Sequence, residues 1–233
     1  MSSNVEEKTR EKITFSKLFW IFVIGSIFGA FYEEILTCIK TLIQTGQFEW
    51  VLRRGVIYGP FSPIYGAGAV LMTILLVRYK NNWMQTYCYG AILGGSFEYL
   101  ISILQEIFIG TCSWNYSKQF LNIHGRTTIP IMMVWGLFVL LFVYVIYPWI
   151  SKLLDAVPKQ FYELMTKVCV VLMAFDLLIS WTALFRQTLR RNNVPPLTPV
   201  GRLYDKVYSD EFLSKYFTNM VPTKKIKRHL KHK

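Results

Sequence analysis

Charged side chains are scarce in this chain. Only 17% of its 233 residues are Asp, Glu, Lys or Arg, whereas 53% are hydrophobic and 16% are aromatic. A soluble domain carries roughly a quarter charged residues. The shortage here falls in long uncharged stretches, each near the ~20 residues that cross about 30 Å of hydrocarbon. The composition therefore excludes an ordinary soluble domain and predicts an all-α, polytopic membrane protein.

Familiar catalytic and metal-binding motifs are also missing. The sequence contains no GxxxxGK[ST] phosphate loop, no HExxH, no CxxC pair and no GxSxG elbow. Three of the four cysteines lie in hydrophobic stretches, where cysteine behaves as a small apolar residue. We therefore expect no cofactor and no metal, and no motif indicates an enzyme.

The net charge of +12 comes from the last part of the chain. From Arg186 onward there are twelve Lys or Arg against Asp205, Asp210 and Glu211, whereas the preceding part is close to balanced. A basic segment beside a membrane span is typical of the cytoplasmic side and is attracted to anionic lipid headgroups. Aromatic and basic residues do not alternate outside the spans, so we expect a lipid bilayer as partner and no nucleic acid.

Five hydrophobic stretches predict about five transmembrane spans. The expected spans are residues 15–43, 64–77, 83–109, 129–150 and 168–185. They divide the chain into an N-terminal polar tail (1–13), a transmembrane helical domain (14–189) and a basic C-terminal tail (190–233). Five crossings with a cytoplasmic C-terminus leave the basic N-terminal residues outside, which conflicts with the positive-inside rule. A sixth crossing by the second stretch would remove the conflict, and both counts stay open.

The second stretch begins with a segment that cannot be a regular helix. It reads VIYGPFSP, and Gly59, Pro60 and Pro63 interrupt helical structure there. Non-helical backbone at membrane depth survives only where protein or water bonds its polar groups. We therefore expect Tyr58–Pro63 to be a broken or re-entrant segment that lines the protein interior.

Two of the spans carry carboxylates on a face of small and polar residues. On the first span this face contains Ser26, Gly29, Ala30, Glu33, Thr37 and Lys40, and on the third it contains Ala91, Gly94, Gly95, Glu98, Ser102, Gln105 and Glu106. A carboxylate at the centre of a membrane helix costs roughly 2.5–3.5 kcal/mol on insertion scales, so such residues normally face the interior. We therefore expect the two faces to pack together.

The counter-charges lie in the loops beside these spans. Arg53 or Arg54 and Arg126 could pair with the carboxylates, and a bidentate pair would lower the cost of burial. The hypothesis is a central polar cluster in which Glu33, Glu98 and Glu106 face Arg54 and Arg126. The candidate set adds Tyr58, Tyr65 and Ser102, with Trp114, Asn115, Asn122 and Asp176 as secondary candidates. Structural ion pairs, a ligand or ion pathway and acid–base chemistry all remain open.

Several of these residues belong to an ordered series of motifs. The series is FGAFYEEIL at 28–36, RRGVIYGPFSPIYGAGAVLM at 53–72, FEYLISILQEIFIG at 97–110, then Trp114, Tyr116 and Ser117, Asn122, Gly125–Arg126, Trp135–Gly136 and Pro148. In these motifs the sequence resembles the family of bacterial membrane proteins described as putative ABC-transporter type IV. Two positions depart from the family pattern: Asn115 replaces the usual Asp, and His124 stands where the family usually has another residue.

The resemblance implies a function in transport. A member of this family is expected to be an ABC-transporter-like permease in the cell membrane, moving a small or lipid-like solute through the polar cluster with a separate ATPase subunit as partner. Two other functions stay open. One is an intramembrane enzyme acting on a lipid or isoprenoid substrate, with Glu98 or Glu33 as acid or base; the other is a non-catalytic membrane scaffold or regulator that uses the basic tail.

Overall fold

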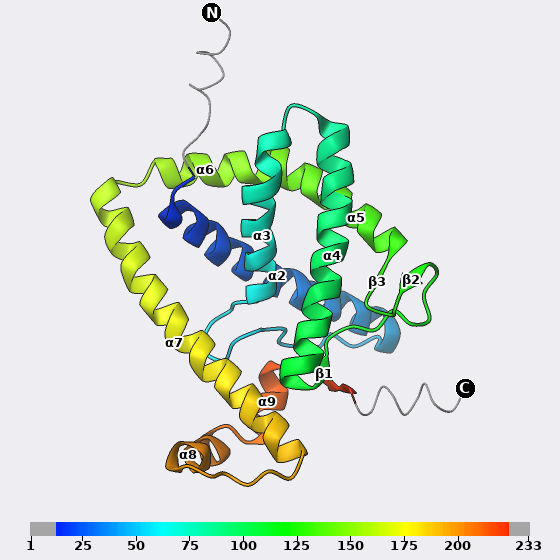
Figure 1. The fold of residues 1–233 in the computed structure, drawn as a ribbon, viewed down its shortest axis with the longest axis vertical. Helices are drawn as coiled ribbons and strands as arrows, with labels where there is room; N and C mark the ends of the chain where they lie inside the picture. The colour runs from blue at the N-terminus through cyan, green and yellow to red at the C-terminus, as the bar shows by residue number, and fades with distance from the viewer. Residues whose placement is uncertain (1–12, 224–233) are drawn as a thin grey trace, which may run out of the picture.

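The computed structural model describes residues 13–223, and it is mostly helical (Figure 1). Nearly all of the expected N-terminal polar tail and the last ten residues of the basic tail lie outside the described residues. Four helical segments are long and apolar enough to cross a membrane: α2 (Phe15–Thr45), α4 (Trp83–Ile109), the continuous run α5 (Ile129–Leu141), η3 (Phe142–Ile146) and α6 (Tyr147–Asp155), and α7 (Lys159–Arg191). The prediction of a helical membrane protein is thereby confirmed. The expected third span, residues 83–109, has the same first and last residues as α4.

The remaining expected span is a shorter helix, α3 (Pro63–Leu76). Its 14 residues extend about 21 Å, less than the ~30 Å of a hydrocarbon core. It crosses α2 closely: the Ser62 amide donates to the Ser26 carbonyl at 2.9 Å, and Gly25 lies against Ala69 farther along α3. The 3-10 turn η2 (Val77–Tyr79) then leads into α4. Four of the five expected spans thus have the length of a crossing.

Local sequence signals set the ends of these helices. The side chains of Thr14, Asn82 and Thr128 accept hydrogen bonds from backbone amides in the first turns of α2, α4 and α5. Gly46 and Gly110 end α2 and α4 in the left-handed region, with φ of 71° and 63°. Each helix therefore begins and ends where its own residues satisfy the free backbone groups.

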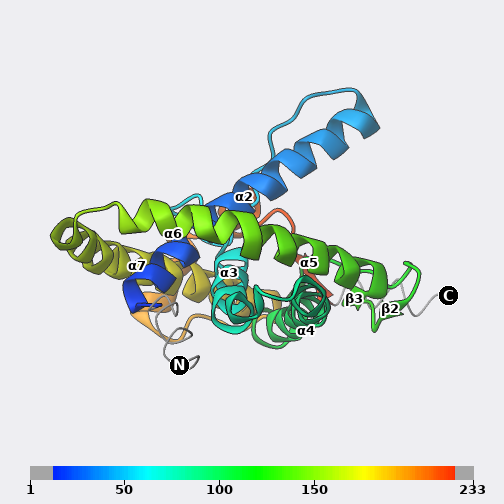
Figure 2. The ribbon, with the colours of Figure 1, turned by 90° about the horizontal axis from the view of Figure 1, so that it is seen from above.

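The small residues of α2 and α4 bring each helix close to the helix that follows it. A Cβ added to Gly29 would overlap Tyr65 of α3, and one added to Gly94 would lie 2.5 Å from the Cβ of Trp135 in α5. The expectation that the polar faces of α2 and α4 pack against one another was therefore wrong. Glycine stripes allow close backbone approach to any neighbour, and here the neighbours are α3 for α2 and α5 for α4. In Figure 1, α3 and α4 run side by side while α2 and α5–α6 cross behind them, and Figure 2 shows the far half of α2 extending away from the other helices.

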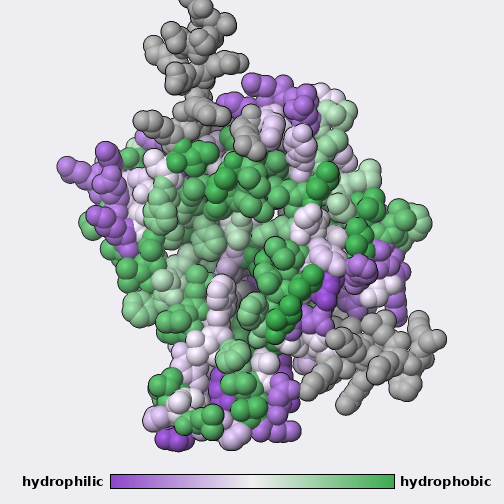
Figure 3. Space-filling model, viewed as in Figure 1, coloured by the Kyte–Doolittle hydropathy of each residue, from purple (hydrophilic) through white to green (hydrophobic). Residues whose placement is uncertain are grey.

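The apolar core lies between α2, α3 and the α5–α6 run. Its buried members are Ile21, Ala69, Met72, Leu76, Val139, Phe142, Val143, Tyr147 and Ile150. The run continues through Pro148 because η3 is a π-helical turn in which the Tyr147 amide donates to the Phe142 carbonyl. On the surface, a broad band of hydrophobic residues covers the middle of the face seen in Figure 3, with hydrophilic residues at its upper and lower margins. This distribution suits a protein surrounded by lipid.

The chain after α7 folds back on the end of the molecule where α4 and α7 terminate. It forms α8 (Pro199–Val207), α9 (Asp210–Tyr216) and β4 (Val221–Pro222), and β4 pairs antiparallel with β1 (Thr111–Cys112). The buried side chains of Leu213 and Phe217 pack with Ile57 and Leu184. The basic tail through residue 223 is therefore packed structure that joins α7 to two loops.

An ionic network holds this folded segment to α7. Arg186 donates from Nε and Nη2 to Asp205, at 2.8 and 2.7 Å, and Arg190 donates to Asp205 at 2.6 Å and to Asp210 at 2.7 Å. The Arg186 side chain is only 8% exposed. Because a buried guanidinium without its carboxylate is costly, these contacts fix where α8 lies.

The docking of α8 should depend on pH through Asp205. Hydrogen bonds from Arg186 hold the pKa of Asp205 below its ordinary value of 3.8. The carboxylate therefore stabilises docking above that pH, and this contribution is lost as the pH falls below it through the lowered pKa. Amide hydrogen exchange in residues 194–208, corrected for intrinsic rates, should be slow at about pH 6 and faster at about pH 3. Asp205→Asn should exchange fast at both, whereas protection equal to wild type at about pH 6, or the same loss in the exposed Glu211→Gln control, would contradict this account.

The glycine contact between α4 and α5 offers a test of the helix pairing. Gly94→Ala places a methyl group against Trp135 and should lower the free energy of unfolding by about 1–3 kcal/mol. Gly68→Ala is the matched control, since its added Cβ meets only Phe97, at 3.6 Å, and alanine favours a helix over glycine. Thermal unfolding of the purified variants measures both effects. Equal midpoints for the two variants would exclude the close α4–α5 contact.

Candidate functional site

Glu98 lies on α4 and is half-buried against the loop that joins α4 to α5. Its carboxylate accepts a hydrogen bond from the Tyr116 hydroxyl at 2.9 Å and another from the Thr127 hydroxyl at 2.7 Å. Both donors come from residues 110–128, and neither is a cation. In these two contacts the donors that orient Glu98 are hydroxyl groups.

A tight hairpin in this loop positions both donors. The strands β2 (Asn122–Ile123) and β3 (Thr127–Thr128) are joined through His124 and Gly125, which have φ of 51° and 67°. Positive φ at both central residues is the requirement of a type I′ turn, which matches the twist of a two-stranded hairpin. The Tyr116 amide then donates to the Gly125 carbonyl at 2.8 Å. This bond brings Tyr116 beside Thr127, so that both hydroxyls reach Glu98.

Three secondary candidates serve to shape this loop. Asn115 accepts hydrogen bonds from the Ser117 amide at 2.9 Å and from its hydroxyl at 2.5 Å. Asn122 accepts from the Gly125 amide at 2.9 Å, and the Trp114 indole donates to the Arg126 carbonyl at 2.8 Å. An amide oxygen can accept these bonds as a carboxylate would, so Asn115 forms this turn without a charged group.

Glu33 lies on α2 and accepts a hydrogen bond from the Tyr65 hydroxyl at 2.8 Å. Burial and the negative charges of Glu98 and Glu33 raise the pKa of the Tyr116 phenol, which donates its hydrogen bond to Glu98. Both predicted carboxylates therefore act on this phenol electrostatically, and of the two it is Glu98 that is hydrogen-bonded to it. We call Glu33, Tyr65, Glu98, Tyr116 and Thr127 the carboxylate–phenol cluster.

Glu106 and Arg126 form a separate pair on the same side of α4. Arg126 pairs with Glu106 and also donates to the Ser102 hydroxyl at 3.0 Å. Ser102 is only 2% exposed, which agrees with its predicted place on the interior face. The charge of Arg126 is therefore directed at Glu106, one turn beyond Ser102, and not at Glu98.

Arg54 pairs with Glu34, which the sequence analysis did not select. The Arg54 Nε lies 3.6 Å from Glu34, whose carboxylate also accepts from the Arg53 amide at 3.3 Å. Glu34 is only 3% exposed. The predicted pairing of Arg54 with the Glu33 cluster was wrong, because α2 is rotated so that Glu34 follows buried Ala30 at a spacing of four residues. Glu33 follows buried Gly29 at the same spacing, so the sequence offered no signal that distinguishes the two carboxylates.

Asp176 anchors the broken segment to α7. Its carboxylate accepts from the Tyr58 amide at 3.2 Å and from the Ser180 hydroxyl at 3.0 Å, and Ser180 accepts from the Ile57 amide at 2.9 Å. The Tyr58 hydroxyl lies 2.7 Å from that of Tyr208. Neither Tyr58 nor Asp176 contacts the carboxylate–phenol cluster through these bonds. Ser180 was missed, although it follows Asp176 by one helical turn.

The two cluster carboxylates lack an ion-pair partner within residues 13–223. The ion pairs of this part of the chain use Asp155, Glu34, Glu106, Glu163, Asp205 and Asp210. Arg53 and Lys40 are near enough to Glu33 to attract it without pairing, and no comparable cation acts on Glu98. The two cluster carboxyl groups are therefore held by hydrogen bonds from three hydroxyl groups and, at Glu98, also from the Trp135 side chain.

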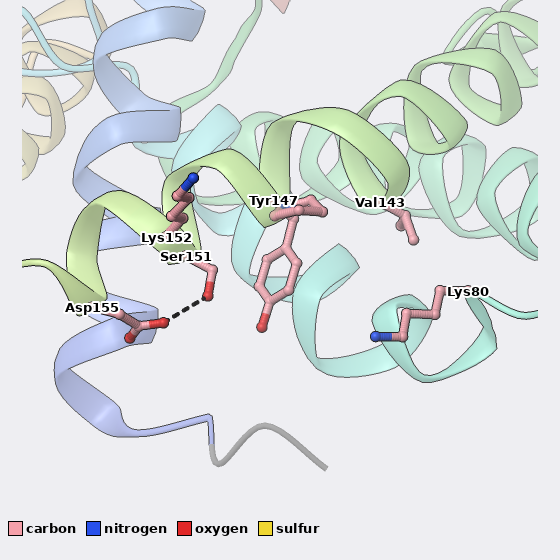
Figure 4. A pocket seen from close by; sticks show the side chains of 7 residues that line it. Lys80, Val143, Tyr147, Ser151, Lys152 and Asp155 are labelled. Atoms are coloured by element: carbon pink, nitrogen blue, oxygen red, sulfur yellow. Dashed lines mark hydrogen bonds between the residues drawn. The ribbon is translucent and has the colours of Figure 1, made fainter. Parts of the chain in front are cut away.

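Two surface cavities lie elsewhere, near the starts of α2 and α7 and beside α6. Their linings include Lys80, Tyr147 and Asp155 in one case (Figure 4) and Phe15 and Thr166 in the other, and no cluster residue lines either of them. Neither of these two cavities therefore belongs to the cluster.

Fold and cluster together define a helical membrane protein with unpaired interior carboxylates. The chain belongs to the family described as "Putative ABC-transporter type IV", which matches residues 20–181 and so covers more than half of its length. The resemblance expected for residues 28–150 is confirmed and extends into α2 and α7. No curated protein and no solved structure matches the chain.

Proposed function

We propose that this protein is the membrane-embedded component of an ABC-type transport system, in which Glu33 and Glu98 bind a positively charged group of a small solute. The observation that carries the proposal is the hydrogen bonding of Glu98 by Tyr116 and Thr127 without an ion pair to any residue between 13 and 223. Family membership supports the transport context. The charge of the solute is inferred from the cluster itself.

The argument for a cation rests on the cost of burying a carboxylate. In apolar surroundings a carboxylate is unfavourable unless it is neutralised or paired. Glu34 and Glu106 already form ion pairs with arginines. Glu33 and Glu98 form no ion pair within residues 13–223. A protonated amine between the two would relieve both charges at once. Burial and both carboxylates raise the pKa of Tyr116, and its hydroxyl would remain as a hydrogen-bond donor beside the bound group.

Thermal unfolding of the purified protein tests this assignment. Choline and spermidine serve as cationic probes, with glucose and glutamate as neutral and anionic controls. The cations should raise the unfolding midpoint of the wild type, by about 2–4 °C for each kcal/mol of binding free energy. Glu98→Gln removes the charge while keeping the shape, so it should abolish the shift.

The matched control for this experiment is Glu163→Gln. Glu163 is a half-exposed residue of α7 whose pair with Lys159 spans 3.9 Å on the surface. It should keep the full cation-dependent shift. The proposal fails if Glu98→Gln responds to cations as the wild type does, or if glucose and glutamate stabilise the protein equally well.

The transport context also requires a partner and an orientation. We assign the folded C-terminal segment to the cytoplasm, because twelve Lys or Arg follow from Arg186 onward. The fifth crossing would be provided by α3 with the preceding non-helical segment.

Two experiments test the partner and the orientation. An affinity-tagged chain should copurify with an ATPase after crosslinking. A cysteine placed at exposed Leu197 should resist membrane-impermeant thiol reagents in intact cells. Labelling of that cysteine in intact cells, or the absence of any ATPase, would contradict this arrangement.

A further inference from the structure

The helix α8 presents an apolar side to its surroundings. None of its 9 residues is buried, and Val200, Leu203 and Val207 are 59%, 57% and 47% exposed. These three residues are spaced at three and four positions, so they lie on one side of the helix, which we call the apolar side of α8. In Figure 1 α8 lies beside the last turns of α7, at the lower end of the molecule. Residues 13–223 therefore leave much of this hydrophobic surface uncovered.

The opposite side of α8 is fixed to α7. Asp205 accepts hydrogen bonds from Arg186 at 2.7 Å and from Arg190 at 2.6 Å. Leu203 and Val207 each lie two residues from Asp205, which places them roughly 160° around the helix axis from it. The ionic network therefore turns these two side chains away from α7, and it determines which side of α8 is free to meet a partner.

Two cations border the apolar side of α8. Arg202 and Lys206 are exposed, lie about one helical turn apart, and directly precede Leu203 and Val207 in the sequence. They form no ion pair with any residue between 13 and 223. Apolar side chains next to unpaired basic ones are typical of helices that lie in the plane of a membrane surface. This arrangement of charge complements a surface of anionic lipids.

The end of α7 brings α8 to the level of the lipid headgroups. The helix α7 is one of the four that are long and apolar enough to cross a membrane. Its exposed Trp181 precedes Arg186, which holds α8, by five residues, or about 8 Å along the helix. Exposed tryptophans near the ends of membrane helices mark the headgroup region. This position favours lipid over a soluble protein as the partner that covers the apolar side.

We propose that α8 lies in the surface of an anionic lipid bilayer, with its apolar side among the acyl chains and with Arg202 and Lys206 at the phosphate groups. The helix then anchors the folded C-terminal segment to the membrane beside α7. This anchoring is separate from the carboxylate–phenol cluster, and it holds whether or not that cluster binds a solute.

Photocrosslinking identifies what covers the apolar side. Full-length protein carrying Leu203→benzoylphenylalanine is reconstituted into vesicles of phosphatidylglycerol and phosphatidylcholine, irradiated, and digested for mass spectrometry. The peptide that contains position 203 should carry lipid adducts. Phosphatidylglycerol should exceed its share of the vesicle among these adducts by about fivefold or more, the contribution of one basic residue near an anionic surface. Glu211→benzoylphenylalanine, at an exposed position of α9, should carry few lipid adducts.

Neutral variants in the Leu203→benzoylphenylalanine background test the two cations. Arg202→Gln with Lys206→Gln should lower the adduct ratio of the two lipids to their ratio in the vesicle, whereas Arg202→Lys with Lys206→Arg should restore the excess of phosphatidylglycerol. Lys118→Gln with Lys159→Gln removes the same charge from exposed positions elsewhere and should keep the excess. Thermal unfolding checks that each variant is folded.

Three results would overturn the proposal. Equal yields of lipid adduct at positions 203 and 211 would show that the apolar side is not immersed in the membrane. A crosslink from position 203 to a second copy of the chain, in place of lipid, would assign the surface to a protein contact. Adducts in the vesicle ratio without any substitution of Arg202 and Lys206 would show that these cations do not select anionic lipid.

Discussion

The structure depends on one constraint: the backbone of the non-helical segment before α3 must find hydrogen-bond partners inside a largely apolar protein. Four hydrogen bonds provide these partners. The Arg53 amide donates to Glu34, and the Ile57 amide donates to Ser180. The Tyr58 amide donates to Asp176, and the Ser62 amide donates to the Ser26 carbonyl. In hydrocarbon an unsatisfied group of this kind costs several kcal/mol. The partners belong to α2 and α7, so the same bonds that satisfy the segment also fix these helices and set α3 against α2. Tyr65, near the start of α3, thereby reaches Glu33.

The interior acidic residues consequently fall into two kinds. Glu34 and Glu106 form ion pairs with arginines, and Asp176 accepts a hydrogen bond from a backbone amide. These contacts stabilise the packing of the helices. Glu33 and Glu98 form no ion pair within residues 13–223 and receive hydrogen bonds from the hydroxyls of Tyr65, Tyr116 and Thr127, with the Trp135 side chain also bonding Glu98. Removing an acid of the first kind should unfold part of the molecule, whereas one of the second kind can gain or lose a cation with little rearrangement. That difference in partners is the physical basis for assigning a binding role to the second kind.

The sequence predicted the helices well because their limits are local. Asn82 and Gly110 cap α4 at the predicted ends, and Pro63 starts α3 after the predicted break. It could not choose between Glu33 and Glu34, since the rotation of α2 is set by the contact of Gly29 with Tyr65, far away in sequence. The sequence did not predict the docking of the tail either. This docking depends on the pairing of β4 with β1 and on the packing of Leu213 in an apolar cluster whose other members are distant in sequence. The candidate list contained Glu33, Tyr65 and Glu98 but not Tyr116 or Thr127, because long-range packing decides which residues meet.

The central claim is that Tyr116 joins Glu33 and Glu98 into one unit. A double-mutant cycle of Glu33→Gln and Glu98→Gln, measured as unfolding free energy, tests it most directly. The account predicts a coupling free energy of at least about 0.5 kcal/mol between the two positions, reduced when the cycle is repeated with Tyr116→Phe. Effects that add to within about 0.3 kcal/mol in the presence of Tyr116 would show two independent carboxylates and contradict the account.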